Sequence, residues 1–100
     1  MIFYHTTTLE QWAQYENQDF YAAPSLDTEG FIHASFAEQL DKTLQLHFKG
    51  IEKVWILTID STLLSSKLVV EGSRDGELFP HIYGFLNKSA IVSRVERVLS

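Results

Sequence analysis

The spacing of hydrophobic and polar residues along the chain predicts six strands. Strict alternation marks a strand with one buried face, whereas an unbroken apolar run marks a central strand covered on both faces. The run from Val54 to Ile59 is of the second kind. The predicted strands are Ile2–Thr6, Gly30–Phe36, Lys53–Asp60, Lys67–Gly72, Phe79–Phe85 and Ile91–Leu99.

Two capping patterns predict the starts of two helices. Thr7 followed by Glu10, and Ser35 followed by Glu38, each place a hydroxyl and a carboxylate where they can bond the free amides of a first turn. The second helix is expected to end at Gly50, because glycine readily adopts the left-handed conformation of a helix stop. The apolar positions at helical spacing are Leu9, Trp12 and Ala13 in the first helix, and Ala37, Leu40, Leu44 and either His47 or Phe48 in the second.

The segments between these elements are expected to be loops and turns. They are Asn17–Pro24, anchored in the core by Phe20 and Tyr21; Ser25–Gly30; Asp60–Ser66, as a helical turn; Ser73–Glu77; and Asn87–Lys88. Strands that dominate the second half of the chain, together with two main helices, predict an α+β fold rather than a doubly wound parallel sheet. We expect mixed, mostly antiparallel sheets in a single small domain, residues 1–100.

The composition narrows the class of protein. A chain of 100 residues is long enough for one domain, and 45% apolar with 21% charged residues is ordinary globular usage. The chain has no cysteine, which excludes a disulfide framework and a thiolate metal site and fits a reducing cytosol. The formal net charge of -5 disfavours nucleic-acid partners. Without a basic leader or a long apolar run, the chain is expected to be cytoplasmic and to have no membrane partner.

The stretch Gly76–Gly84 concentrates polar and aromatic groups on one predicted strand. Pro80 confines that strand to an edge or a bulge, where side chains are often redirected toward a site. Alternation would give one face an imidazole set among aromatic rings. The residues of that face are Phe79, His81, Tyr83 and Phe85. The alternative interpretation is an ordinary core face with a hydrogen-bonded histidine.

Three of the four histidines, His5, His33 and His81, fall on predicted strands and are expected to line one cleft. No two histidines have the close spacing typical of zinc ligands, so no metal site is predicted. His33 also lies just before a predicted helix start, where free amide groups could bind an anion. Each of the three could instead be a hydrogen-bonded core histidine.

Three segments carry a resemblance to a known family. Ile2–Thr7, Glu29–Ser35 and Gly76–Gly84 resemble the motifs of a small bacterial family known as domain of unknown function 952. That family is similar in fold to the ADP-ribosyltransferase superfamily. The resemblance implies an α+β domain with a cleft between two sheets, which holds NAD in true transferases.

The same resemblance implies roles for single residues. Tyr4–Thr7 resembles the superfamily's Tyr-His-Gly-Thr, with Thr6 in place of the glycine, and implies that His5 holds a ribose. Ile32–Ser35 is similar to the end of the His-x-His-Leu-Ser motif of RNA 2′-phosphotransferases. Glu77 is the candidate for the late catalytic glutamate.

Two hypotheses of function follow. In the first, the domain transfers ADP-ribose or uses an NAD-like small-molecule substrate. Its catalytic residues would be Glu77 and His33, and its binding residues His5, Thr6, Ser35, His81 and Tyr83. In the second, the cleft is a non-catalytic site for a small nucleotide or anion. The two differ at Glu77, since only the enzyme needs that carboxylate inside the cleft near His5.

Overall fold

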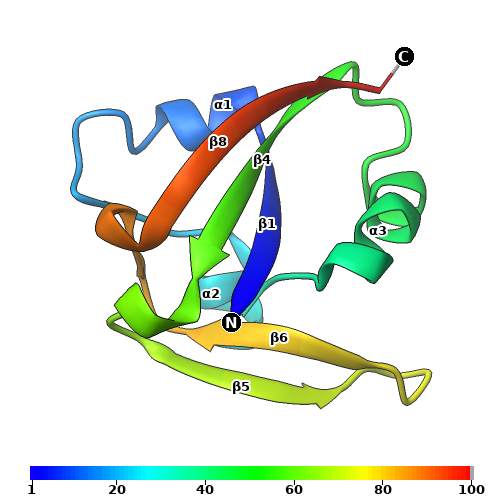
Figure 1. Cartoon of the computed structure of the whole chain (residues 1–100). Coiled ribbons are helices and arrows are strands. Elements are labelled where there is room, and N and C mark those ends of the chain that lie inside the picture. The colour runs from blue at the N-terminus through cyan, green and yellow to red at the C-terminus, as the bar shows by residue number, and fades with distance from the viewer. Residues whose placement is uncertain (100) are drawn as a thin grey trace.

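Three antiparallel sheets and three short α-helices make up the computed structural model over the residues it describes, 1–99 (Figure 1). The first sheet has the order β1-β4-β8, the second β2-β7 and the third β3-β6-β5. The strands are β1 (Ile2–Thr8), β2 (Phe20–Tyr21), β3 (Ile32–His33), β4 (Lys53–Asp60), β5 (Lys67–Gly72), β6 (Leu78–Tyr83), β7 (Leu86–Asn87) and β8 (Ile91–Val98). The helices are α1 (Leu9–Ala13), α2 (Ser25–Glu29) and α3 (Leu40–His47), and 3₁₀ turns occupy Ala37–Gln39, Ser61–Leu63 and Lys88–Ala90.

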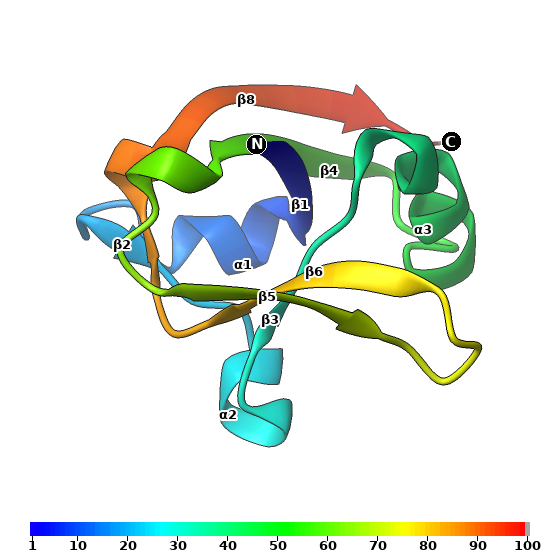
Figure 2. The same cartoon turned by 60° about the horizontal axis from the view of Figure 1, so that its bottom comes forward.

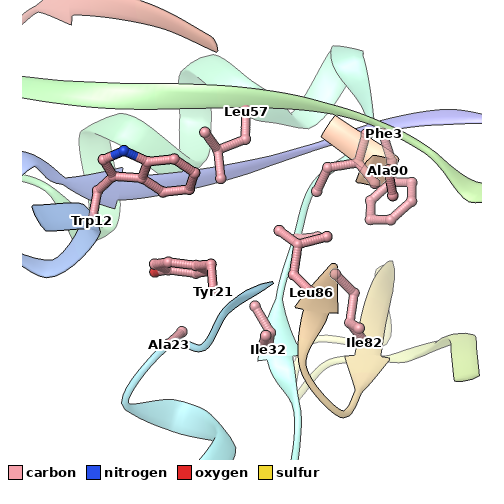
Figure 3. Close-up of a cluster of buried hydrophobic side chains, with 11 residues drawn as sticks. Phe3, Trp12, Tyr21, Ala23, Ile32, Leu57, Ile82, Leu86 and Ala90 are labelled. Atoms are coloured by element: carbon pink, nitrogen blue, oxygen red, sulfur yellow. The ribbon is translucent and has the colours of Figure 1, made fainter. Parts of the chain in front are cut away.

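The two three-stranded sheets form separate layers, with α1 lying between them on one side and α3 on the other (Figure 2). The main core fills the space between these layers and contains Phe3 from β1, Leu57 from β4 and Ile82 from β6, all fully buried. Figure 3 shows Trp12 and Tyr21 facing each other at one end of this core. A smaller cluster of Leu40, Leu44, Val54 and Ile56 lies where α3 packs against β4.

The predicted fold class is confirmed at this level, as a small α+β domain with antiparallel sheets and few helices. The bounds predicted for Lys53–Asp60 and Lys67–Gly72 match β4 and β5. β4 is the central strand of its sheet, as its continuous apolar run indicated. No helix within residues 1–99 is long and apolar enough to cross a membrane.

The segment Gly30–Phe36 is not the continuous strand that its alternation predicted. Only Ile32 and His33 pair with β6, and Ala34 N–H still donates to the Pro80 carbonyl at 3.2 Å. Ser35 then pairs with Tyr4 of β1 through two backbone hydrogen bonds of 2.7 and 2.8 Å. The segment therefore leaves one sheet for the other, which ends β3 early and ties the two layers together.

Both capping predictions were wrong in position. Thr8, and not Thr7, caps α1, because its hydroxyl accepts the Gln11 N–H at 3.1 Å. Before α3, the Phe36 N–H donates to the Gln39 side chain at 2.9 Å, so Ser35 caps nothing there.

Two predicted turn regions contain regular structure. Ser25–Gly30 holds α2, which ends at Gly30 with a left-handed φ of 89°. Asn17–Pro24 and Asn87–Lys88 were predicted as a loop and a turn, but they contribute β2 and part of β7, which pair with each other. Tyr21 is fully buried, as expected of a core anchor. The predicted strand Phe79–Phe85 ends at Tyr83, and Phe85 packs on Phe20 instead of extending the aromatic face.

Candidate functional site

A cleft of about 710 Å³ lies where β1, β3, β6 and α3 meet. Five of the sequence-predicted site residues line it: His5, Thr6, His33, Ser35 and His81. The strand histidines therefore converge, as their placement suggested. Two other predicted site residues, Glu77 and Tyr83, do not line this cleft.

His5 is a structural link between the two layers. Its Nδ1 lies 2.5 Å from the His33 carbonyl oxygen, and its Nε2 lies 3.0 Å from the Tyr21 hydroxyl. A carbonyl can only accept, so Nδ1 carries the hydrogen and Nε2 is the acceptor. Burial lowers the pKa of His5 from 6.5 to about 4, which keeps the ring neutral at pH 7. Both ring nitrogens already have protein partners, so neither is free for a ribose hydroxyl in this arrangement.

Tyr21 extends this network into the core. Its hydroxyl also lies 2.8 Å from Oγ1 of Thr7, and its ring stacks on Trp12 with centroids 5.5 Å apart. Burial raises the pKa of Tyr21 to about 12, with the hydrogen bond to Thr7 acting in the opposite direction. The sequence analysis placed Tyr21 in the core but did not foresee this partnership with His5.

His33 stands at the rim of the cleft. Its Nε2 lies 2.9 Å from Oε2 of Glu29, one helical turn earlier at the end of α2, and both side chains are about half exposed. The pair has this geometry because α2 ends at Gly30 and the chain turns directly into β3. One imidazole nitrogen of His33 is therefore held by a carboxylate, and the ring remains accessible to a ligand.

His81 lies directly opposite His33 on the neighbouring strand, but it is almost completely buried. Its Nδ1 lies 2.7 Å from Oε1 of Glu71 on β5, and its ring stacks on Phe31 with centroids 4.0 Å apart. Its Nε2 has no hydrogen-bond partner within residues 1–99 and is not enclosed by protein atoms, so this nitrogen faces the cleft.

Tyr83 lies behind His81 and does not line the cleft. Its hydroxyl donates to the same Glu71 oxygen that His81 contacts. The hydrogen bonds from Tyr83 and then His81 hold the pKa of the Glu71 carboxyl below its usual range, and the bond to Glu71 raises the pKa of Tyr83. Glu71 was not singled out from the sequence, because only the β5–β6 register brings it next to His81.

Thr6 offers backbone groups to the cleft. Tyr4 uses its N–H and C=O to pair with Ser35 on the open edge of β1. Alternate residues of a strand point these groups the same way, so the N–H and C=O of Thr6 point to that open edge as well. Within residues 1–99 they make no hydrogen bond, and Thr6 lines the cleft.

Ser35 contributes to the cleft wall. It is buried, and its Oγ lies 3.0 Å from Oγ1 of Thr43 on α3. This bond fixes the wall where the chain passes from β3 toward α3. A ligand hydroxyl could join it, since each of the two hydroxyls has a further acceptor lone pair.

Glu77 lies outside the cleft, in the loop between β5 and β6. Its Oε2 accepts the Gln39 side-chain amide at 3.0 Å, and Lys42 lies 3.9 Å from its other oxygen. Gln39 also donates to the Leu78 carbonyl at 2.7 Å. Glu77 therefore anchors its loop to the start of α3, and it is not the carboxylate near His5 that a transferase would require.

The cleft carries more basic than acidic side chains. Arg74 and the four histidines of the chain line it, whereas Glu29 is the one acidic side chain among the described residues that do so. Three phenylalanine rings complete the wall: Phe31, Phe48 and Phe79. The wall therefore combines one guanidinium, one carboxylate and several imidazoles with aromatic rings.

The comparisons with known proteins agree with this fold. The chain is similar to protein CC0527 from Caulobacter crescentus, with 27% sequence identity to its crystal structure, a TM-score of 0.90, and coverage of 100% of this chain and 89% of that chain. The solution NMR structure of CC0527 has 24% identity and a TM-score of 0.78, covering 99% of this chain and 86% of that one. The search of curated proteins found no match. The family described as "Protein of unknown function (DUF952)" matches residues 6–94, and the chain belongs to this family.

Proposed function

We propose that this domain binds a small nucleotide-type ligand, with a planar ring and a phosphate, in the cleft between its two main sheets. The observation that carries this proposal is the lining of the cleft, in which the guanidinium of Arg74 and the rings of Phe31, Phe48 and Phe79 lie in one pocket. A guanidinium pairs well with phosphate oxygens, and phenylalanine faces accept a stacked base. A concave pocket that combines apolar walls with a few polar groups is also the usual place for a ligand.

The open edge of β1 supports an amide-bearing ring as one part of the ligand. The free N–H and C=O of Thr6 match a group that offers an acceptor beside a donor, such as a carboxamide or the edge of a nucleobase. The resemblance to ADP-ribosyltransferases makes NAD-like molecules the first members of this class to test.

The binding function is better supported than ADP-ribosyl transfer. Transfer requires a carboxylate beside the ribose, and Glu77 is instead committed to Gln39 outside the cleft. His5, the expected ribose ligand, has both nitrogens bonded within the protein.

Binding can be measured by thermal shift and by calorimetry with NAD, ADP-ribose, nicotinamide and inorganic phosphate. A ligand at a hundred times its dissociation constant should add about 2.7 kcal/mol to the free energy of unfolding. We expect Arg74→Ala to weaken the phosphate-bearing ligands by about tenfold to a hundredfold, because it removes a charge-assisted hydrogen bond. Arg97→Ala, which removes the same charge from exposed β8, is the control and should change nothing. If none of the four compounds binds, the proposed function is wrong.

A further inference from the structure

Two imidazoles in the cleft are each held by a carboxylate, and they lie next to each other on neighbouring strands. His33 and His81 are cross-strand partners on β3 and β6, with ring centroids 5.5 Å apart and planes at 85°. Glu29 holds Nε2 of His33, and Glu71 holds Nδ1 of His81. A carboxylate on one ring nitrogen fixes the tautomer and balances the charge of the imidazolium that forms during proton transfer.

We propose that His33 and His81 are an acid–base pair that hydrolyses a phosphodiester bound in this cleft. The inference rests on the proposed function, since it needs a nucleotide-type ligand there. His81 is the base, because Glu71 holds its Nδ1 and leaves Nε2 facing the cleft. His33 is the acid, because its place at the exposed rim lets the leaving alcohol escape to solvent.

The reaction uses water as its one co-reactant. Nε2 of His81 takes a proton from water while the water oxygen forms a bond to phosphorus. The bond from phosphorus to the ester oxygen breaks, and that oxygen takes the proton from Nδ1 of an initially protonated His33. The products are a phosphomonoester and an alcohol, and proton exchange with solvent returns both rings to their starting states.

A diester fits the cleft better than a monoester or an anhydride. One guanidinium, Arg74, matches the single negative charge of a diester. An alkoxide leaving group needs a proton from an acid, whereas a phosphate leaving group departs without one, so a second imidazole has a use mainly with an ester.

The groups that face the two imidazoles define the expected pH dependence. His81 faces Glu71 from β5, with Tyr83 behind that carboxylate, and His33 from β3. His33 faces Glu29 from α2, while neutral His5 from β1 contacts its carbonyl. Arg74 lines the same cleft from the β5–β6 loop. One free base and one protonated acid should give a bell-shaped profile of kcat/KM.

The test follows cleavage of adenosine 2′,3′-cyclic phosphate to adenosine monophosphate by chromatography, with binding of the same compound measured separately by calorimetry. His81→Ala and His81→Gln should each lower the rate by about a hundredfold or more while the circular dichroism spectrum stays unchanged. Glu71→Gln should lower kcat and shift the limb of the pH profile that reports the base. Glu77→Gln, which removes a neighbouring carboxylate outside the cleft, should leave the rate unchanged.

A substrate with a different leaving group distinguishes the role of the acid, His33, from that of the base, His81. His33→Ala should lose cleavage of the cyclic nucleotide but retain most of its activity on bis(p-nitrophenyl) phosphate, since nitrophenolate leaves without a proton. His81→Ala should lose both activities. Binding without cleavage, or cleavage that survives loss of His81, would overturn this inference and leave the proposed function standing. If no nucleotide binds, both this inference and the proposed function are wrong.

Discussion

Nδ1 of His5 lies 2.5 Å from the carbonyl oxygen of His33, so a neutral imidazole joins β1 to β3 at the point where the two sheets come together. The Tyr21 hydroxyl holds the other ring nitrogen. The ring is therefore part of the framework on which the cleft is built, and it also lines the cleft.

The free energy of unfolding should fall as pH drops from 6.5 toward 4, because burial depresses the folded-state pKa of His5 to about 4. The unfolded chain binds a proton on this ring below pH 6.5 and the folded chain does not, so acid favours unfolding throughout this range. The loss from His5 should be roughly 2 kcal/mol between about pH 7 and about pH 5. Urea titrations at both pH values measure it.

Asparagine in His5→Asn keeps a donor for the His33 carbonyl but does not titrate. The part of the pH dependence of the free energy of unfolding that comes from His5 should therefore disappear. His47→Asn, at an exposed position of α3, should retain it. An unchanged slope in His5→Asn would show that other groups cause the acid sensitivity.

Sequence patterns predicted correctly those elements whose structural neighbours stay the same along their whole length. β4 is apolar on both faces because it is central, so its limits could be read from residues 53–60 alone. The segment after Gly30 could not be read this way, because Ser35 exchanges its pairing partner from β6 to β1. α2 was missed because five residues with no buried side chain show no helical periodicity.

The sequence predicted which histidines line the candidate site, but it did not predict the residues that form hydrogen bonds with them. Their positions on predicted strands indicated that His33 and His81 line one cleft, but Glu71 reaches His81 only through the pairing of β5 with β6. Glu77 directly precedes β6 in the sequence, yet the path of the β5–β6 loop places its side chain against Gln39, outside the cleft. Which carboxylate reaches an imidazole depends on register and loop path, which are tertiary properties.

Gln39→Ala should destabilise the domain by roughly 1–3 kcal/mol, because it removes a buried side chain that bonds both the Phe36 N–H and the Leu78 C=O. Glu77→Gln should cost less than about 1 kcal/mol, because Gln39 can still donate to the remaining amide oxygen and the Lys42 contact is exposed. Urea denaturation of the two variants compares them. Equal losses would mean that the contact of Gln39 with Glu77, and not its bonds to the two backbone groups, carries the stability of this junction.

Gly84→Ala should destabilise the domain more than Gly76→Ala. Both glycines have positive φ, 148° and 84°, but a Cβ at Gly84 would lie 2.5 Å from Oγ of Ser66, whereas the space around Gly76 is open. Gly76→Ala measures the conformational cost alone, which is about 1 kcal/mol. The difference between the two losses in the free energy of unfolding then measures the clash with Ser66. Ser66→Ala should rescue part of the loss at Gly84, and a lack of rescue would place the strain in the backbone alone.

Tyr21→Phe should destabilise the domain by roughly 1–3 kcal/mol, because it leaves the buried Nε2 of His5 without a hydrogen-bond partner. Tyr15→Phe is the control, since the Tyr15 hydroxyl makes no hydrogen bond within residues 1–99 while its ring contacts Tyr21 edge-on at 5.5 Å. The decisive measurement is a double-mutant cycle with His5→Asn, which has no Nε2. Loss of the Tyr21 hydroxyl should cost clearly less in that background. If it costs the same with and without the imidazole, the hydroxyl stabilises the fold through Thr7, and the link from Tyr21 to His5 contributes nothing measurable.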